Sequence, residues 1–473
     1  MPILYFHLLV VLPLSLRIFL RDGLLPEKRV AWCVAVWLFP FGGSLLYFLF
    51  GEISLGRGAA RTYHALSAAL RENAGAAAGT PALIDAVPDA YRAPFAYLHS
   101  INGFYPVAGN RAELMTDGSS ARARLLADME AARREICVLY YIWLDDDTGR
   151  AVARALIRAA QRGVVCRALA DGLGSRAFLR SRTWRDMAAA GVQTAVALPI
   201  DRPLHTILTG RIDLRNHRKI TLIDGEITHC GSQNCADESF AVKARFAPWV
   251  DIMLRWQGPV AAQMRLLFAA DWQSATGRTL PELPAAKPFS DGIGAQVMGE
   301  GPTERAQSTP QFLAALIGTA QRQLWISTPY FVPDATVLSA LCAAALRGVD
   351  VRLILPQRND SRIVAAASRS HYRSLLAAGV AVFEYAPGLL HAKTLTLDGR
   401  LCLTGSTNLD RRSFDLNFEN NILFDDAALC GQVIGRQRQY LADSQRITEA
   451  RIAAWPVWRR LWQNLVASAS PIL

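Results

Sequence analysis

One sequence motif, which we call the string, occurs twice in the chain. This duplication constrains the fold more than any other feature. The first copy reads NHRKITLIDGEITHCGSQN and the second reads LHAKTLTLDGRLCLTGSTN. The intervals between the shared polar residues are the same in both copies: His217, Lys219, Asp224, Ser232 and Asn234 in the first, and His391, Lys393, Asp398, Ser406 and Asn408 in the second. Two copies with identical intervals predict two units of similar structure.

The same alternation of strand-like and helix-like segments precedes each string. The first half runs EICVLYYIWLDDDTG, AVARALIRAAQRGV, VCRALAD and AAGVQTAVAL, and the second runs QLWISTPYFVPD, VLSALCAAALRGV, VRLILP and AAGVAVFEY. Strands that alternate with helices of about 12 residues predict an α/β sheet in each half. We expect two similar α/β domains packed about a pseudo-twofold axis, with one site at their interface.

An Asp-Gly pair inside each string predicts a hairpin. Asp224-Gly225 is flanked by β-branched or apolar residues, as is typical of a two-residue turn. With Ile223 opposite Glu226, counting back along the ladder sets His217 opposite Ser232. The aspartate lies at the turn, where we expect it to fix the hairpin.

The second copy repeats this prediction, with His391 opposite Ser406 around the turn Asp398-Gly399. Because side chains alternate between faces, the lysine of each copy shares the face of its histidine, and the asparagine shares the face of its serine. Imidazole can attack phosphorus or carry a proton, ammonium neutralises phosphoryl oxygens, and hydroxyl and amide groups bind them. The combination predicts a phosphodiester site.

Two apolar runs stand at the N-terminus. Residues 30–50 form 21 residues without a charge, enough to cross a hydrocarbon core of ~30 Å, and residues 3–20 form a second, marginal span. The first run lacks a basic beginning and a small-residue cleavage site, which excludes a removed signal peptide. We predict a transmembrane helical hairpin, and the alternative is a buried hairpin of the core.

The composition limits the kinds of partner that the chain can bind. Hydrophobic residues make up 51% of the chain and charged residues 19%, which excludes a disordered chain. The net charge of +11 favours anionic partners, either phospholipid headgroups or nucleic acid. The eight cysteines show no metal-ligand spacing and indicate a reducing compartment, so we expect no metal and a cytoplasmic catalytic part.

These observations divide the chain into four parts. We expect a membrane hairpin in residues 1–58, a linker or amphipathic segment in 59–108, a first domain in 109–290 and a second domain in 291–473.

The paired strings resemble those of the phospholipase D superfamily, and the chain is similar over nearly its whole length to bacterial cardiolipin synthases. The narrower resemblance rests on GGSLLYFLFG, LRNHRKITLIDG, TPYFVPD, GLLHAKTLTLDG, GSTNLDRRSFDLNFENN and the terminal SPIL. It implies a multi-pass enzyme of the bacterial inner membrane that uses no metal or cofactor, acts on phosphatidylglycerol, and needs neither nucleic acid nor an obligate protein partner.

The resemblance also implies a two-step transfer. One histidine attacks the phosphorus of a phosphatidylglycerol and releases glycerol, and a hydroxyl of a second phosphatidylglycerol then displaces the histidine to give cardiolipin. By analogy with the superfamily, His217 is the expected nucleophile and His391 the acid and then the base, although the near-symmetry permits the reverse. The candidate catalytic set is the His, Lys and Asp of both strings: His217, Lys219, Asp224, His391, Lys393 and Asp398.

Further residues are expected to support the phosphate or the histidines. Ser232, Asn234, Ser406 and Asn408 come from the strings. A histidine needs a partner that orients its free nitrogen, and Glu419 and Asp251 stand where family members carry such carboxylates. Two segments, CADESF and PLHTILTGRID, depart from the family and leave the acceptor open.

Other activities use the same residues. A phospholipase D would transfer the phosphatidyl group to water and release phosphatidic acid, and phosphatidylethanolamine could serve as donor. A nuclease of the superfamily would also explain the charge, but the apolar N-terminus argues against it. Analysis of the lipid product distinguishes synthase from hydrolase.

A tryptophan-rich segment, AWPVWRRLWQNLV, lies near the C-terminus. Trp455, Trp458 and Trp462 fall at helical spacing, with Arg459 and Arg460 on another face. The segment predicts an amphipathic helix that either faces the core, the more common case, or dips into an anionic leaflet.

Overall fold

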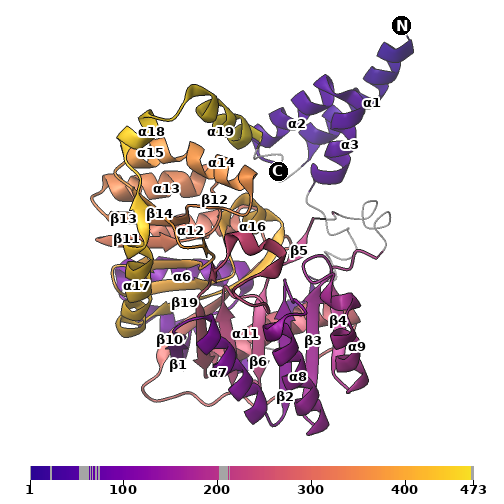
Figure 1. Cartoon of the computed structure of the whole chain (residues 1–473), viewed down its shortest axis with the longest axis vertical. Coiled ribbons are helices and arrows are strands. Elements are labelled where there is room, and N and C mark those ends of the chain that lie inside the picture. Colours follow the sequence, from indigo (N-terminus) through magenta and orange to yellow (C-terminus); the bar gives the residue numbers. More distant parts are fainter. Residues whose placement is uncertain are drawn as a thin grey trace.

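Two α/β halves share one continuous sheet in the computed structural model, and three N-terminal helices stand at one end of it (Figure 1). The structure describes residues 2–21, 24–52, 75–201, 211 and 213–469, together with single residues between 63 and 72. Most of the departing segment PLHTILTGRID and part of the predicted linker, before residue 75, lie outside the described residues.

The first half supplies seven strands of the sheet: β1 (Val107–Leu114), β2 (Glu135–Tyr140), β3 (Val165–Asp171), β4 (Gln193–Ala197), β6 (Lys219–Ile223), β7 (Ile227–Gly231) and β9 (Met253–Gln257). The second half supplies their counterparts and one edge strand: β10 (Ile293–Glu300), β11 (Gln323–Ser327), β13 (Asp350–Pro356), β14 (Ala381–Tyr385), β16 (Thr394–Leu397), β17 (Leu401–Gly405), β19 (Asn417–Asp425) and β20 (Ser444–Arg446).

Counted outward from the junction, equivalent strands of the two halves follow in the same order, so the order along the whole sheet is reversed from one half to the other. It runs β20-β14-β13-β11-β16-β17-β19-β10 in the second half and continues β1-β9-β7-β6-β2-β3-β4 in the first, with β10 and β1 antiparallel at the junction. A reversal of this kind is what a pseudo-twofold axis between the halves produces. The α/β prediction is therefore confirmed, and the expected boundary at residues 290/291 falls just before β10.

Helices cover both faces of the sheet because parallel strands require crossovers. In the first half these helices are α7 (Gly118–Ala131), α8 (Asp147–Gln161), α9 (Arg182–Ala189) and α11 (Val260–Thr276). In the second half they are α12 (Ser308–Gly318), α13 (Ala335–Leu346), α14 (Arg362–Ser370), α15 (Tyr372–Ala377), α16 (Arg411–Asp415), α17 (Ala427–Ala442), α18 (Glu449–Ala453) and α19 (Val457–Ala469). Short helices α5 (Ala82–Asp85) and α6 (Asp89–Asn102) precede the first half.

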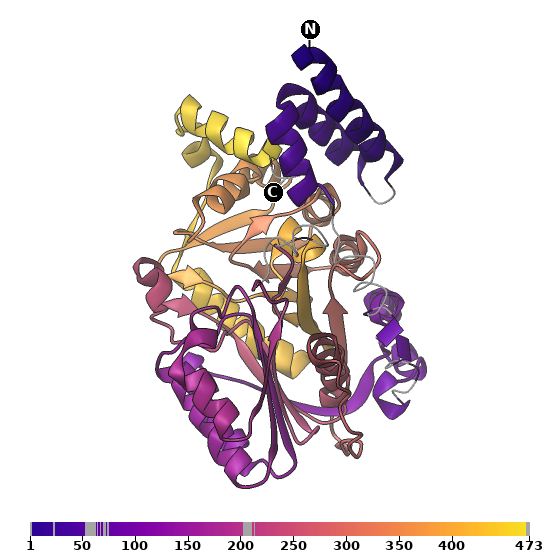
Figure 2. The same cartoon turned by 90° about the vertical axis from the view of Figure 1, so that its right-hand side faces the viewer.

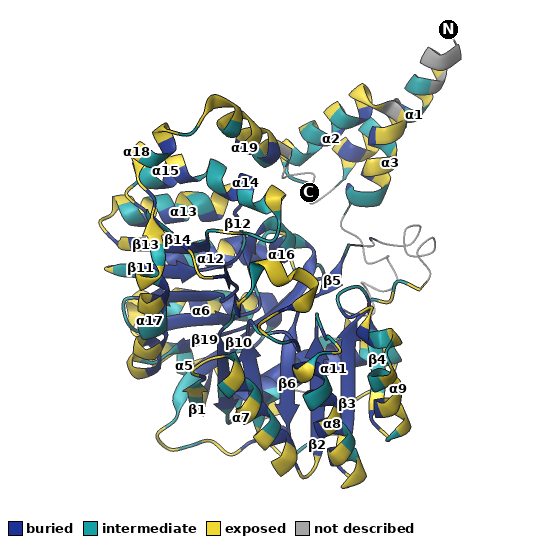
Figure 3. Cartoon of the chain, viewed as in Figure 1, coloured by how far each residue is buried: buried dark blue, intermediate teal, exposed yellow. Residues whose placement is uncertain are grey.

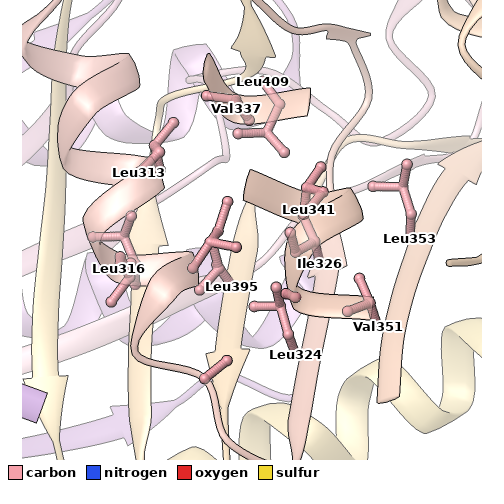
Figure 4. Close-up of a cluster of buried hydrophobic side chains, with 14 of the residues drawn as sticks. Leu313, Leu316, Leu324, Ile326, Val337, Leu341, Val351, Leu353, Leu395 and Leu409 are labelled. Carbon is pink, nitrogen blue, oxygen red and sulfur yellow. The ribbon is translucent and has the colours of Figure 1, made fainter. Parts of the chain in front are cut away.

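The sheet is the buried layer of the molecule (Figure 3). In the second half, leucine, isoleucine and valine side chains of α12, α13, β11, β13 and β16 interlock between helices and sheet (Figure 4). Helix α6 adds Phe95, Leu98 and Ile101 to this same cluster. The end of the predicted linker is thus part of the second half's core.

The N-terminal helices differ from the prediction. The apolar run at residues 30–50 is divided between α2 (Pro26–Leu38) and α3 (Pro40–Phe50), and α1 (Pro2–Leu20) precedes them. Phe39, at φ −128° and ψ 73°, is not helical, because Pro40 follows it: a proline removes a backbone donor and restricts the residue before it. Within the described part of the chain, no helix is both long enough and apolar enough to cross a membrane.

Two contacts join these helices to the α/β body. Lys28 of α2 forms an ion pair of 2.7 Å with Asp415 of α16. At the end of α3, the carbonyl oxygen of Phe50 accepts a 2.7 Å hydrogen bond from the guanidinium of Arg211. Both contacts lie close in the chain to the strings, since α16 follows the second and Arg211 precedes the first.

The hairpin turns are one residue longer than predicted. Asp224 and Gly225 have positive φ angles of 56° and 72°, and Glu226 N donates to Ile223 O at 3.0 Å, as in the expected turn. The ladder, however, pairs Ile223 with Ile227, and the second copy likewise pairs residue 397 with 401. The predicted register is wrong.

Neighbouring strands explain the longer turn. Asp224 N donates to the carbonyl oxygen of Glu135, the first residue of β2, and the N–H of Gly258, just after β9, donates to Glu226 O, both at 2.9 Å. Each end of the turn is thus bound to a different strand, so Glu226 stays in the turn. The ladder then stops before it reaches the histidine, and the predicted cross-strand pairing of histidine with serine is wrong in both copies.

The turn aspartates bind backbone N–H groups, as expected for residues that fix the hairpin. Asp224 accepts hydrogen bonds from residues 133–135, and Asp398 accepts them from residues 321–323. Asp398 also accepts a bond of 2.8 Å from the hydroxyl of Tyr91. Burial acts to raise the pKa of Asp398, but the backbone hydrogen bonds lower it below the ordinary value.

Replacing Asp398 by Ala should lower the free energy of unfolding by about 1–3 kcal/mol, because donors at the strand start lose their acceptor. A carboxyl with a lowered pKa stabilises above its unfolded pKa, and the stabilisation is lost as the pH falls through the folded pKa. Denaturant titrations in detergent at pH 7 and pH 3 measure both effects. Asp291→Ala, at an exposed surface ion pair with Arg111, is the control. Equal destabilisation by both variants would contradict the anchoring role.

Candidate active site

Each histidine of the strings is fixed by a strand of the other half. His217 lies between β5 (Arg215–Asn216) and β6, and its backbone N donates to Phe418 O of β19 at 2.9 Å. His391 follows β15 (Leu389–Leu390), and its N donates to Val250 O of β8 (Trp249–Val250) at 2.8 Å. The short strands pair the same way, β5 with β19 and β15 with β8. Both histidines therefore lie at the interface between the halves.

Each histidine also contacts a carboxylate across this interface. Nδ1 of His217 lies 2.8 Å from Oε2 of Glu419, and Nδ1 of His391 lies 2.6 Å from Oδ1 of Asp251. Each histidine is thus paired with the carboxylate that follows the opposite string. With Nδ1–H donated to a carboxylate, Nε2 keeps its lone pair for another partner.

The serines of the strings bind these carboxylates rather than facing the histidines. Ser232 Oγ donates to Asp251 Oδ1 at 2.6 Å, and Ser406 Oγ donates to Glu419 Oε2. Each serine oxygen also accepts a backbone N–H from the residue after the carboxylate, Ile252 or Asn420. The serines hold the carboxylates, which in turn hold the histidines of the other half.

Both lysines are buried beside their histidines. Lys219 Nζ donates to His217 O, and Lys393 Nζ donates to His391 O, each at 2.6 Å. The asparagines bind neighbouring segments: Asn234 Oδ1 accepts from Ile142 N after β2 at 3.3 Å, and Asn408 Nδ2 donates to Ser413 Oγ of α16 at 3.1 Å.

The four basic side chains lower one another's affinity for protons. Burial, and then the positive charges of both lysines, lower the pKa of His217 well below its ordinary value. Burial and Lys393 lower the pKa of His391 to about 4. Burial lowers the pKa of Lys219 to about 8 and that of Lys393 to about 7. Lysines of both halves act on each histidine, so the four groups form one cluster.

The two carboxylates respond differently to this cluster. Burial raises the pKa of Glu419 to about 7, against the lowering effect of Lys219. Burial also acts to raise the pKa of Asp251, but the charge and hydrogen bond of His391 keep it below the ordinary value. An anionic group bound among the basic side chains would relieve their mutual repulsion.

Two aromatic rings at the site have no counterpart in the predicted set. Tyr141 packs against His217 with ring centroids 4.8 Å apart, and its face lies 5.5 Å from Nζ of Lys219. Trp249 packs against His391 at 4.7 Å. In the sequence, only position could have indicated these residues: Tyr141 comes just after β2, and Trp249 comes two residues before Asp251. The rings shield the histidines from water on one side.

A buried carboxyl, Glu300, was also missed. It lies directly opposite Glu419 on adjacent strands β10 and β19 and accepts hydrogen bonds from Thr309, Thr407 and Asn421. Burial raises the pKa of Glu300 to about 7. Nothing in its sequence neighbourhood distinguishes it from a surface residue, because only strand pairing brings it beside Glu419.

Polar contacts connect the site to the end of α3. Arg412, whose charge lowers the pKa of His217, donates to Asp213 O at 2.8 Å. Asp213 forms an ion pair of 2.6 Å with Arg211, which binds Phe50 O. Across the described ranges, no group of three or more His, Cys, Asp or Glu side chains is arranged to hold a metal ion.

Comparisons with known proteins agree with this geometry. The family described as "Cardiolipin synthase, PLD-like domain" matches residues 125–272 and 313–439, which include both strings. Cardiolipin synthase A of Serratia proteamaculans is 36% identical over 98% of this chain and 96% of its own length. This chain belongs to the cardiolipin synthase family. The corresponding enzyme of Klebsiella pneumoniae is equally similar, with 36% identity over the same shares.

Two further matches extend the family assignment. The family described as "Phospholipase D-nuclease N-terminal" matches residues 15–52, which contain the end of α1 with α2 and α3. A crystal structure of phosphatidylserine synthase from Haemophilus influenzae superposes with a TM-score of 0.55 and 14% identity, covering 76% of this chain and 95% of that chain. The two chains thus share a fold over most of their length.

Proposed function

We propose that the protein synthesises cardiolipin from two molecules of phosphatidylglycerol and releases glycerol. The observation that carries the proposal is the pair of buried histidines, each held by a carboxylate of the opposite half, within a chain whose full-length relatives are named cardiolipin synthase A. A site shared between two similar halves suits a reaction in two similar steps.

In the first step His217 is the nucleophile. Its Nε2 lone pair forms a bond to phosphorus, the bond from phosphorus to the headgroup glycerol breaks, and protonated His391 gives its proton to the departing oxygen. The negative charge of Glu419 at Nδ1 stabilises the imidazolium of the phosphatidyl-histidine. Lys219 and Lys393 neutralise the charge on the phosphoryl oxygens.

In the second step His391 acts as base. It takes the proton from a free hydroxyl of a second phosphatidylglycerol, the hydroxyl oxygen bonds to phosphorus, and the bond between phosphorus and His217 breaks. The products are cardiolipin and the original enzyme. The lowered pKa leaves His391 unprotonated near neutral pH in the free enzyme, and a bound phosphate anion raises that pKa so that the first step begins with a protonated histidine.

The substrate requires contact with a membrane. Helices α1–α3 expose apolar side chains along their length: Tyr5, Leu9, Leu12, Leu16, Phe19, Leu20, Val30, Val34, Trp37, Leu38, Phe39, Phe41, Leu45, Leu46 and Phe48. We propose that these helices insert into the bacterial inner membrane as a multi-pass anchor, with the catalytic halves in the cytoplasm. The contacts from Phe50 through Arg211 to Arg412 support lipid entry from this side, because moving a diacyl lipid into water costs ~0.8 kcal/mol per CH₂.

Mass spectrometry of the lipids formed by purified protein in phosphatidylglycerol vesicles tests the proposal. Cardiolipin and glycerol in equal amounts are expected. Phosphatidic acid as the main product would mean that water is the acceptor and that the protein is a phospholipase D. Vesicles that also contain phosphatidylethanolamine reveal whether that lipid serves as donor.

Chelation should leave the rate unchanged, because the histidines and lysines supply the nucleophile, the acid and the charge neutralisation. The initial rate of cardiolipin formation is compared with and without EDTA, at constant ionic strength to preserve vesicle binding. Loss of activity in EDTA that a divalent ion restores would overturn the proposed mechanism.

A further inference from the structure

The C-terminal helix α19 presents its apolar side chains to the exterior (Figure 3). Val457, Trp458, Leu461, Trp462 and Leu465 are between 50% and 77% exposed. Their spacing of three and four residues places them on one face of the helix. We call this face the α19 apolar stripe.

The opposite side of α19 attaches it to the body. Gln463 and Val466 are buried, and Val466 packs with Ala366 and Ala367 of α14. A surface helix of a soluble protein normally buries its apolar face and exposes its polar one. In α19 this arrangement is reversed, so the expectation of a core-facing helix is wrong for Trp458 and Trp462, whereas Trp455, just before the helix, packs against the core.

One arginine borders the α19 apolar stripe. At 100° per residue, Arg460 lies beyond the Val457 edge and is exposed. Arg459 falls between Val466 and Gln463 on the side that faces the body, where it packs over the ring of Trp455 at 4.1 Å. An apolar stripe with an exposed cation at its edge is typical of a helix that lies in the headgroup region of an anionic membrane.

The position of α19 agrees with this pattern. In both views α19 lies at the same end of the molecule as α1–α3, beside them (Figures 1 and 2). The exposed apolar residues of α1–α3 and those of the α19 apolar stripe therefore lie at the same end of the molecule. A membrane that receives the N-terminal helices would also meet this helix.

We propose that α19 is a second membrane contact, lying in the interface of an anionic leaflet with its apolar stripe toward the acyl chains. This inference rests on the proposed function, since it assumes that the N-terminal helices bring the protein to phosphatidylglycerol. Two contacts side by side at one end of the molecule would hold that end of the body against the lipid in one orientation.

An environment-sensitive fluorophore on a cysteine at position 461 tests the proposal in the full chain. The partly exposed Cys33 and Cys342 are first replaced by Ser, and the other six cysteines are buried. Leu461→Cys is compared with Leu346→Cys, which is on α13 and 73% exposed. In phosphatidylglycerol proteoliposomes, emission from position 461 should shift to shorter wavelength and be quenched severalfold by brominated lipid, whereas position 346 should show neither effect.

Charge reversal provides a second readout. Arg460→Glu, in the Leu461→Cys background, should reduce quenching by brominated phosphatidylglycerol, because Arg460 is exposed beside the stripe. Unchanged quenching in this variant would contradict the role of Arg460 in selecting an anionic leaflet.

Two results would overturn the proposal. Emission at position 461 that matches position 346 in vesicles would leave the stripe in water. Protection that grows with protein concentration, without quenching by brominated lipid, would mean that a second copy of the chain covers the stripe. The cardiolipin assay on the same vesicles separates the two claims: an active sample with an unquenched label disproves only the membrane contact, and an inactive sample with a quenched label disproves only the synthase.

Discussion

Alanine in place of His217 or His391 should lower the rate of cardiolipin formation by at least about 10²-fold in either variant, because acid–base assistance alone contributes ~10²–10⁴-fold. Loss of the nucleophile also removes the covalent route altogether. Initial rates with phosphatidylglycerol vesicles measure the effect. His99→Gln, which changes a partly exposed histidine stacked on Tyr105, is the control for a general effect of losing an imidazole.

The role of each histidine can be separated with an activated substrate. A phosphatidyl ester of nitrophenol needs no protonated leaving group, so His391→Ala should still form a phosphatidyl adduct on His217, visible by mass spectrometry of the intact protein. His217→Ala should form none. The reverse pattern would exchange the two roles, and more than about a tenth of the rate in either alanine variant with phosphatidylglycerol would disprove the shared site, given the acid–base contribution above.

The second large effect on the rate is expected from replacing Glu419 or Asp251, the carboxylates that bind the histidines from the opposite half. Glu419→Gln and Asp251→Asn should each lower the rate with phosphatidylglycerol by about 10²–10⁴-fold, because a neutral amide neither stabilises the imidazolium nor enforces the tautomer with a free Nε2. Glu384→Gln is a matched control, since Glu384 is a buried carboxylate that pairs with Arg369 away from the strings.

Because each carboxylate binds the histidine of the other half, the Glu419 and Asp251 variants should differ in the reaction step that they slow. Glu419 binds His217, so Glu419→Gln should block adduct formation even with the activated ester. Asp251 binds His391, so Asp251→Asn should spare the adduct and slow its transfer to the second lipid. If Asp251→Asn blocked the adduct and Glu419→Gln spared it, each carboxylate would serve the histidine of its own half, contrary to the structure.

Several features could be predicted from the sequence because they depend on local patterns. The alternation of strands and helices, the duplication, and the turn at Asp224 and Asp398 all follow from residue types at short range. The break in the N-terminal run was also readable, since Pro40 stands in its middle and a proline rarely continues a helix. The prediction of a single helix over residues 30–50 is wrong, because Pro40 interrupts the run whatever its hydropathy.

The remaining features depend on contacts between residues far apart in the chain. The hairpin register shifted by one residue because β2 and β9 hold opposite ends of the turn, and no local signal contains that competition. Likewise, α19 exposes its tryptophans because α14 accepts Val466 instead.

The sequence by itself determined which groups form the cluster at the interface: two histidines and two lysines within duplicated strings. Only the tertiary structure decided how they are held, because His217 takes its carboxylate from residue 419 and His391 takes its own from residue 251. Such pairings are set by the packing of the halves across their pseudo-twofold axis. Spacing along one chain cannot distinguish a partner in the same half from a partner in the other.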